Sequence, residues 1–141
     1  MKIKFVLLLY FFSNFLFSQN STDDKINNII SDISVERLKN DIQTLVNFGT
    51  RHTLSDTASK TRGIGAARNW IKKSFDEISH NCNNCLEVFF QKNYFKKNNL
   101  RLIKDVWINN VVAIQRGNKY PNRYILMSGD IDSRVSNPND F

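Results

Sequence analysis

The spacing of apolar residues changes its period at two closely spaced cysteines, Cys82 and Cys85, and this change limits the folds open to the chain. Before the cysteines, apolar residues recur at steps of three and four, which predicts two amphipathic helices. After them, aromatic and β-branched residues gather in three runs that predict strands. The expected order is therefore helix, helix, strand, strand, strand, without an internal repeat.

Residues that commonly begin and end helices support two separate helices in this region. The first should follow Ser34, a suitable N-cap, and end at Gly49. The second has helical spacing over Ile64–Ile78, with Thr61 as a candidate cap. Its "GIGAA" lacks the spacing of a dinucleotide-binding loop, and we interpret these small residues as a close helix contact.

The strand region predicts a hairpin followed by a central strand. Leu86–Phe95 and Asp105–Gly117 are strand-like, and Lys96–Leu100 would link them. Arg123–Ser128 is more uniformly apolar, which is typical of a strand at the buried centre of an α/β sheet. Sites in such sheets form beyond the carboxyl ends of the central strands.

Two carboxylates follow this third run. Asp130 and Asp132 are two residues apart, so in an extended chain they would point to the same side. Carboxylate oxygen binds hard or borderline cations, including zinc. One acid could be a ligand and the other its support. The alternative is an Asp-rich turn that ends a strand.

The first 18 residues have the pattern of a signal peptide. Lys2 and Lys4 precede a short apolar run, Phe5–Phe17, and Ser18 is a small residue before a plausible cleavage site. The run is short for a bilayer span, which needs about 20 residues. We therefore expect export to the periplasm or outside the cell, with no stable membrane anchor after cleavage. An uncleaved anchor and a buried helix are the alternatives.

The charge of the mature chain does not favour nucleic-acid binding. Removal of Lys2 and Lys4 lowers the formal net charge from +7 to +5. The longest local basic run holds only Lys92, Lys96 and Lys97, which suits a solvated face or a hairpin tip. A nucleic-acid binder would gather more lysine and arginine on one face, so we expect no nucleic-acid partner.

Cys82 and Cys85 could form a local disulfide, half of a zinc site or a redox pair. A redox motif would need a strand before it and a helix after it, and here that order is reversed. A four-cysteine zinc site would need a second pair. Export to an oxidising compartment favours the disulfide, with free thiols as the next alternative.

The segment "NNVVAIQRGNKYPNRYILMSGDIDSR" resembles the first core strands of zinc-dependent aminopeptidases with two co-catalytic metals, the relatives of bacterial leucyl aminopeptidase. That family has an "N-V-[IV]-A" strand, a turn with Gly and Pro, and a hydrophobic strand ending in "GHxDS". The matching positions are Asn110–Ala113, Gly117, Pro121, Tyr124–Gly129, Asp132 and Ser133. Upstream, "LVNFGTRHTLS" and "GIGAARNWIKKSFDEI" resemble the helices of the same domain, with Arg51 and His52 in the loop between them.

One departure from the family pattern concerns the metal. The first zinc ligand of the family is the His of "GHxDS", and Asp130 stands at that position. A carboxylate would add negative charge, weaken the pull on bound water and favour harder ions. Asp132 falls where the family has the acid that supports this ligand. The two acids would repel each other unless a cation or proton lies between them, so the site is either a variant or lost, and we favour the variant.

The resemblance implies a fold and an activity. The expected fold is α/β, with N-terminal helices and the first strands of a three-layer α/β/α mixed-sheet metallopeptidase domain, truncated in this sequence. The expected domains are a signal peptide at 1–18, a polar lead-in with a short helix at 19–33, and the N-terminal part of the peptidase domain at 34–141. Within the lead-in, Gln19–Lys25 is interpreted as loose and Ile26–Ile33 as a helical turn.

The implied activity is zinc-dependent removal of residues from the N-terminus of a peptide substrate by metal-activated water. A catalytic zinc needs about three protein ligands and an open water position. Because the family's other ligands and its Glu base lie downstream, we expect this chain alone to be inactive. His52 and His80 are interpreted as structural. Two alternatives stay open, a non-catalytic exported α/β module and, more weakly, a thiol-active protein using Cys82 and Cys85.

Overall fold

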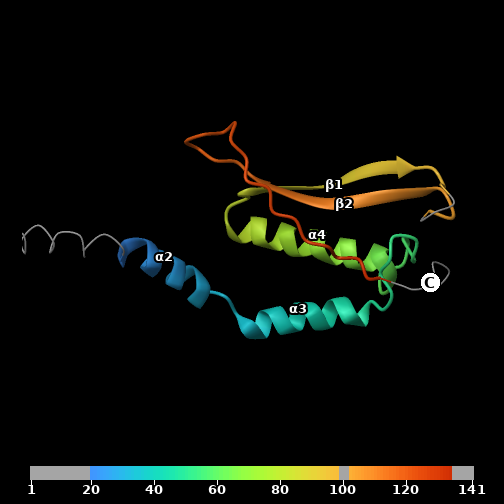
Figure 1. Ribbon diagram of the computed structural model, residues 1–141, viewed down its shortest axis with the longest axis horizontal. Helices are drawn as coiled ribbons and strands as arrows, with labels where there is room; N and C mark the ends of the chain where they lie inside the picture. Colours follow the sequence, from blue (N-terminus) through green and yellow to red (C-terminus); the bar gives the residue numbers. More distant parts are fainter. Residues whose placement is uncertain (1–19, 99–101, 135–141) are drawn as a thin grey trace, which may run out of the picture. The chain divides into compact units, whose positions relative to one another are not determined.

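The computed structural model describes residues 20–98 and 102–134 of the chain (Figure 1). The predicted signal peptide lies outside these residues. The chain divides into two compact units, Met1–Asn40 and Asp41–Phe141. Among the helices that the structure describes, none is both long and apolar enough to cross a membrane.

Helix α2 spans Asn20–Ser31 and begins earlier than predicted. The interpretation of Gln19–Lys25 as loose is wrong from Asn20 onward, because the helix already includes these polar residues. The apolar residues of the segment, such as Ile26 and Ile29, are exposed. Asp24–Ser31 are all exposed, so no buried apolar stripe sets the extent of this part of the helix.

Helix α3 spans Val35–Asn47 and has the predicted ends. The Ser34 hydroxyl accepts the backbone N–H of Arg37 at 3.1 Å, which confirms the N-cap. Gly49 has φ +69°, and its N–H donates to the Val46 carbonyl at 2.9 Å. A left-handed glycine just past the last turn is a common way to end a helix.

Helix α4 spans Gly63–Asn81, and its start differs from the prediction. Thr61 is not the cap; Arg62 occupies that position and makes no side-chain cap bond. The first N–H groups of the helix bond instead to residues before it, each at 2.9 Å: Gly63 to the Phe48 carbonyl, Ile64 to the Ser55 hydroxyl and Gly65 to the Asp56 carbonyl. The preceding loop therefore supplies the acceptors that a capping side chain would provide.

The small residues of "GIGAA" do form a close contact, but the partner is this loop and not another helix. A Cβ atom added at Gly65 would lie 2.5 Å from the Thr57 carbonyl oxygen, and one at Gly63 would lie 2.5 Å from the Asp56 carbonyl oxygen. Ala67, one turn further, is fully buried. Glycine is thus required where the loop backbone touches the helix backbone.

A short turn joins the end of α4 to the first strand. The buried Ser79 hydroxyl donates to the Leu86 carbonyl at 2.9 Å and accepts the Leu86 N–H at 3.2 Å. Asn83 and Asn84 have φ of 57° and 59°. Asparagine tolerates this left-handed conformation better than most residues, which accounts for the "CNNC" sequence of the turn.

The two predicted hairpin strands are confirmed as β1 (Leu86–Phe95) and β2 (Val106–Gln115). They pair antiparallel, with Leu86 opposite Gln115 and Phe95 opposite Val106, and the hairpin packs along α4 (Figure 1). Near the far end of the hairpin, the Tyr94 and Trp107 rings lie 5.2 Å apart between centroids. The Tyr94 hydroxyl donates to Asp105 and holds the pKa of that carboxyl below its usual value.

The predicted third strand at Arg123–Ser128 is wrong. This segment has no strand structure, and β1 and β2 form a two-stranded sheet within the described residues. Ile125 is 94% exposed, and Leu126 and Met127 are each 90% exposed. The apolar composition predicted burial, which the described residues do not show, and a strand also needs a neighbouring strand to pair with. The α/β fold class itself is confirmed by the helices and the hairpin.

The buried core of the described residues is small. Its fully or nearly buried apolar side chains are Leu54, Ala66, Ala67 and Val106. Asn109 on β2 has a buried side-chain oxygen with no hydrogen-bond partner among the described residues. A buried acceptor without a donor costs free energy. Together with the small core, this predicts a low free energy of unfolding for this part of the chain.

Substitution of Gly65 by alanine should destabilise the fold. The new Cβ atom would lie 2.5 Å from the Thr57 carbonyl oxygen, and overpacking of this kind costs about 1–3 kcal/mol. The matched control is Gly129→Ala, because nothing lies within 4 Å of a Cβ atom there. Urea denaturation of both variants measures the difference, and equal stability would contradict the close contact.

The exposed run Tyr124–Met127 should cause self-association of the isolated chain. We expect the double variant Ile125→Lys, Met127→Lys to reduce association without loss of stability, because both side chains are at least 90% exposed. Light scattering against concentration measures the association. A parent chain that stays monomeric at high concentration would contradict this expectation.

Candidate functional site

The two predicted site acids lie on an extended segment near the C-terminal end of the described residues. Exposure alternates along it: Asp130, Asp132 and Arg134 are exposed, whereas Ile131 and Ser133 are partly buried. Alternation of this kind is what an extended backbone produces, with every second side chain on one face. Both carboxylates are therefore on the solvent side of the segment.

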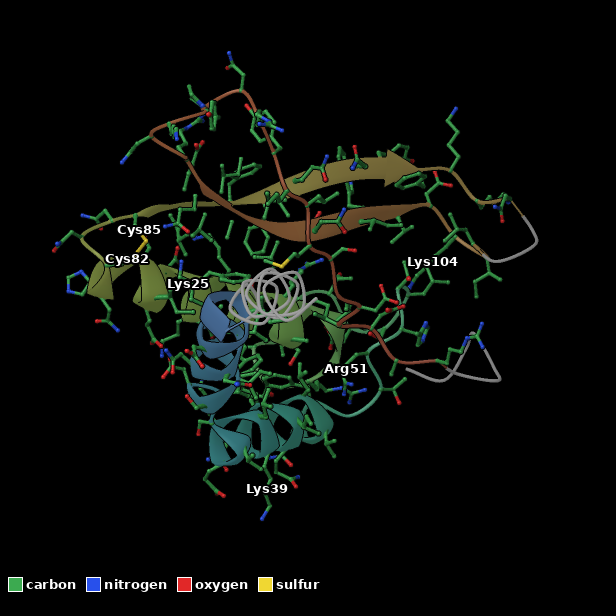
Figure 2. All side chains as sticks on the ribbon, turned by 60° about the vertical axis from the view of Figure 1, so that its left-hand side comes forward. Lys25, Lys39, Arg51, Cys82, Cys85 and Lys104 are labelled. Atoms are coloured by element: carbon green, nitrogen blue, oxygen red, sulfur yellow. A yellow bond between two sulfur atoms is a disulfide. The ribbon has the colours of Figure 1, made fainter. Side chains whose placement is uncertain are left out.

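The opposite side of the segment is held by Arg51, which precedes it by about 80 residues in sequence. The backbone N–H of Arg51 donates to the Ser133 hydroxyl at 2.8 Å, and the Ser133 N–H donates to the Arg51 carbonyl at 3.3 Å. The Arg51 Nε donates to the Ile131 carbonyl at 3.1 Å. Figure 2 shows Arg51 beside this segment.

The same guanidinium also contacts the end of α3. Its Nη1 donates to the carbonyls of Leu45 and Gly49, the latter at 3.1 Å. Carbonyls in the last turn of a helix have no partner within the helix. A cation there also interacts favourably with the helix dipole. Arg51 thus joins the end of a helix to the segment that carries the acids.

The loop after Arg51 is fixed by its own polar groups. The Asp56 carboxylate accepts the backbone N–H groups of Ala58 at 2.9 Å and Ser59 at 2.8 Å. These two bonds, with that from Ser59 the stronger, lower the pKa of the Asp56 carboxyl. The Arg68 guanidinium on α4 donates to the Thr57 carbonyl at 2.8 Å. The loop is therefore held both internally and against the helix.

His52 is a buried part of this loop. Its Nδ1 accepts the backbone N–H of Leu54 at 3.2 Å, and its carbonyl accepts the Ser55 N–H at 2.9 Å. An Nδ1 that accepts a hydrogen bond has its lone pair engaged with the backbone. These contacts agree with the structural role expected for His52.

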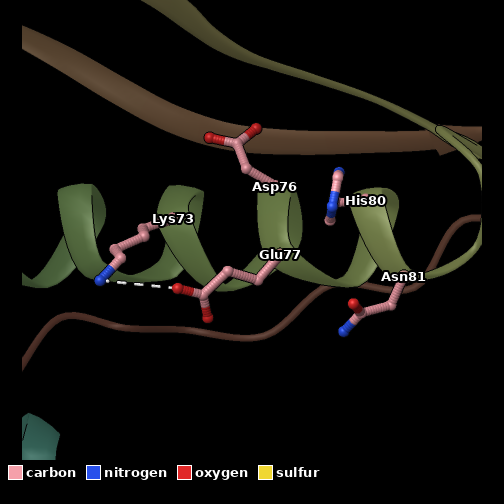
Figure 3. A pocket seen from close by; sticks show the side chains of 5 residues that line it. All are labelled: Lys73, Asp76, Glu77, His80 and Asn81. Carbon is pink, nitrogen blue, oxygen red and sulfur yellow. Dashed lines mark ion pairs between the residues drawn. The ribbon is translucent and has the colours of Figure 1, made fainter.

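His80 belongs to an exposed, shallow hollow on α4 (Figure 3). Its lining residues are Lys73, Asp76, Glu77, His80 and Asn81. Asp76 pairs with Lys72 at 2.8 Å, and Glu77 pairs with Lys73 at 3.5 Å. Exposed pairs of this spacing contribute little beyond local helix stability. Each acid of the hollow forms an ion pair with a lysine on the same helix. The hollow is therefore typical of a solvent-exposed helix face.

Cys82 and Cys85 are joined by a disulfide with their Cα atoms 5.4 Å apart (Figure 2). The bond closes the turn between α4 and β1, and Cys82 is the C-cap of the helix. Reactive cysteines are activated at helix N-termini or beside cations. The opposite end of the helix offers no such activation, which argues against the thiol-active alternative.

The described residues do not complete a zinc site. Within residues 20–98 and 102–134, no group of three or more His, Cys, Asp or Glu side chains is placed to hold a metal ion. Asp130 and Asp132 could supply two oxygen donors of the kind that divalent ions accept, but a zinc site needs more. The donor set therefore fits part of a site, and no catalytic step follows from it.

Sequence reasoning did not foresee the role of Arg51 and Ser133. The resemblance placed Arg51 in a loop between helices, but local pattern has no signal for a contact between residues 82 positions apart. Only the alternation of acids with Ile131 and Ser133 hinted that one face of the segment would be bound.

Comparison with known proteins identifies relatives. A "Probable zinc metalloprotease" of Pyrenophora tritici-repentis is 40% identical over 122 residues, which are 84% of this chain and 28% of that protein. A protein of the same name from Pyrenophora teres f. teres is 41% identical over 122 residues, covering 84% and 26%. One from Phaeosphaeria nodorum is 37% identical over 126 residues, covering 87% and 25%.

This chain is thus similar to part of several fungal proteins named "Probable zinc metalloprotease". It spans about a quarter of the length of these relatives. No family model matches the chain. No solved structure matches it either. The names of these relatives support the expected metallopeptidase and zinc. They do not support the narrower resemblance to the bacterial leucyl aminopeptidase family.

Removal of the disulfide should lower stability without other effects. A cross-link over a four-residue loop stabilises by about 2 kcal/mol in the chain-entropy account. We expect the variant with Cys82→Ser and Cys85→Ser to lose about this much in urea denaturation. A reducing agent should lower the free energy of unfolding of the parent chain by the same amount and leave that of the variant unchanged. A parent chain whose stability does not respond to reduction would contradict the role of the bond.

Proposed function

We propose that this chain is the part of an exported zinc aminopeptidase that supplies the first metal ligand. The observation that carries the proposal is the pair of exposed acids, Asp130 and Asp132, on one side of a segment fixed from its other side. Relatives named "Probable zinc metalloprotease" support the reaction class. The signal-peptide pattern of residues 1–18 supports export.

In this proposal the two acids have different roles. Asp130 is the ligand, because it stands where the resembling family has its ligand His. Asp132 is the supporting acid, and a cation between the two carboxylates removes the repulsion that would otherwise act between them. A zinc ion held by Asp130 together with further ligands would supply polarisation of the peptide carbonyl and activation of a water molecule.

The remaining ligands are assigned to residues outside the described part of the chain. The matched region is only about a quarter of each relative, which leaves ample length for them. Because catalytic zinc needs about three protein ligands, the described residues alone should bind metal weakly and hydrolyse no peptide. The proposed substrate is a peptide with a free N-terminus.

Zinc titration by calorimetry tests the proposal. We expect the Asp130→Ala variant to bind zinc about tenfold more weakly than the parent chain, since loss of even a supporting residue of a metal site costs about 10–100-fold. The matched control is Asp76→Ala, which removes an exposed acid that is paired with Lys72 on α4. It should bind zinc as the parent does.

The same titration separates the main alternative. A non-catalytic exported module would not need either acid, so equal zinc binding by the parent and Asp130→Ala would remove the case for a metal ligand and favour that module. A loss confined to Asp76→Ala would move the metal to the hollow on α4.

A further inference from the structure

We propose that Arg51 is a positioning residue that fixes the direction of the Asp130 and Asp132 carboxylates. This inference rests on the proposed function, because it concerns the same metal-binding segment. It adds a residue, far before the acids in sequence, whose task is to hold the segment rather than to touch metal or substrate.

The contacts alternate with the acids along the segment. Arg51 bonds to the carbonyl of Ile131 at 3.1 Å and pairs in both directions with Ser133 at 2.8 and 3.3 Å. The residue between these two anchors is Asp132, and the residue before them is Asp130. When the backbone is fixed at alternate residues, the side chains between them are forced to the other face.

The guanidinium suits this task because of its geometry. Its Nε reaches the acid-bearing segment while its Nη1 reaches the Leu45 and Gly49 carbonyls at the end of α3. Its donors form a rigid planar fork, so fixing one side of the group fixes the other. A lysine has the same charge on a flexible stem and cannot span both sets of acceptors at once.

The charge of Arg51 also leaves the acids available. Its guanidinium donates to backbone carbonyls on both sides, and both carboxylates stay exposed on the far face of the segment. An arginine that paired with Asp130 or Asp132 would compete with a cation for the same oxygens. The arrangement therefore positions the acids without neutralising them.

Two NMR readouts on the complete chain test the inference. The first is exchange of the Ser133 backbone N–H with solvent deuterium, which reports the bond to the Arg51 carbonyl. The second is the broadening of the Ile131 and Ser133 amide signals by Mn²⁺, a paramagnetic ion that carboxylates accept. The variants are Arg51→Lys, Arg51→Ala and Ser133→Ala.

Ser133→Ala keeps the guanidinium and its bonds to the end of α3, so it loosens the segment without disturbing the helix. The matched control is Arg116→Ala, which removes an exposed arginine whose partner is Glu87 on the hairpin. Dispersed amide spectra of each variant show that it is folded.

We expect Arg51→Ala and Arg51→Lys to speed exchange of the Ser133 amide and to weaken Mn²⁺ broadening by about tenfold, the equivalent of the one charge-assisted hydrogen bond that the guanidinium makes to the segment. Ser133→Ala should weaken the broadening by a smaller factor, and Arg116→Ala should change neither readout. Failure of lysine to rescue separates fork geometry from charge.

Equal Mn²⁺ broadening in the parent chain and Arg51→Lys would overturn the positioning role and leave the metal role of Asp130 intact. Absence of broadening in the parent chain would overturn the metal role and the positioning role with it. A Ser133 amide that exchanges freely in the parent chain would overturn the positioning role alone.

Discussion

The close approach of the 55–57 loop to the first turn of α4 is the contact on which the rest of the described structure depends. Gly65 permits it, because any side chain there would meet the Thr57 carbonyl at 2.5 Å. The loop in return accepts the first N–H groups of the helix through Ser55 and Asp56. This fixed loop continues back to Arg51, and Arg51 holds the segment of the acids. The same loop therefore carries both the close contact with α4 and the residue that bonds to the segment of the two carboxylates.

The local elements could be predicted from the sequence because their signals are local. Ser34 and Gly49 mark the ends of α3, and the change of period at the cysteines marks the passage from α4 to the hairpin. The prediction of Thr61 as the cap was wrong because the first N–H groups of α4 bond to acceptors in the preceding loop. The helix propensity of single residues cannot predict such contacts.

The third strand and the positioning of the acids could not be predicted in the same way. Tyr124–Met127 is as apolar as a central strand, but pairing depends on a neighbouring strand and not on composition. The segment of Asp130 and Asp132 owes its direction to Arg51, about 80 residues away. Sequence patterns identified the two acids as chemically suitable, and their spacing predicted that they share one side of the segment. The contact with Arg51 on the other side had no signal in the sequence.

In the proposed site, Asp130 stands where the resembling family has its ligand His, and this difference would set the charge of the metal site. An anionic ligand lowers the net charge of a zinc site and so reduces the acidity of bound water. The measurement that tests the central claim most directly is a crystal structure of the protein grown with zinc, with the metal located by anomalous scattering. We expect zinc about 2.0–2.2 Å from an Asp130 carboxylate oxygen. Zinc bound elsewhere, with Asp130 in solvent, would contradict the assignment of Asp130 as a ligand.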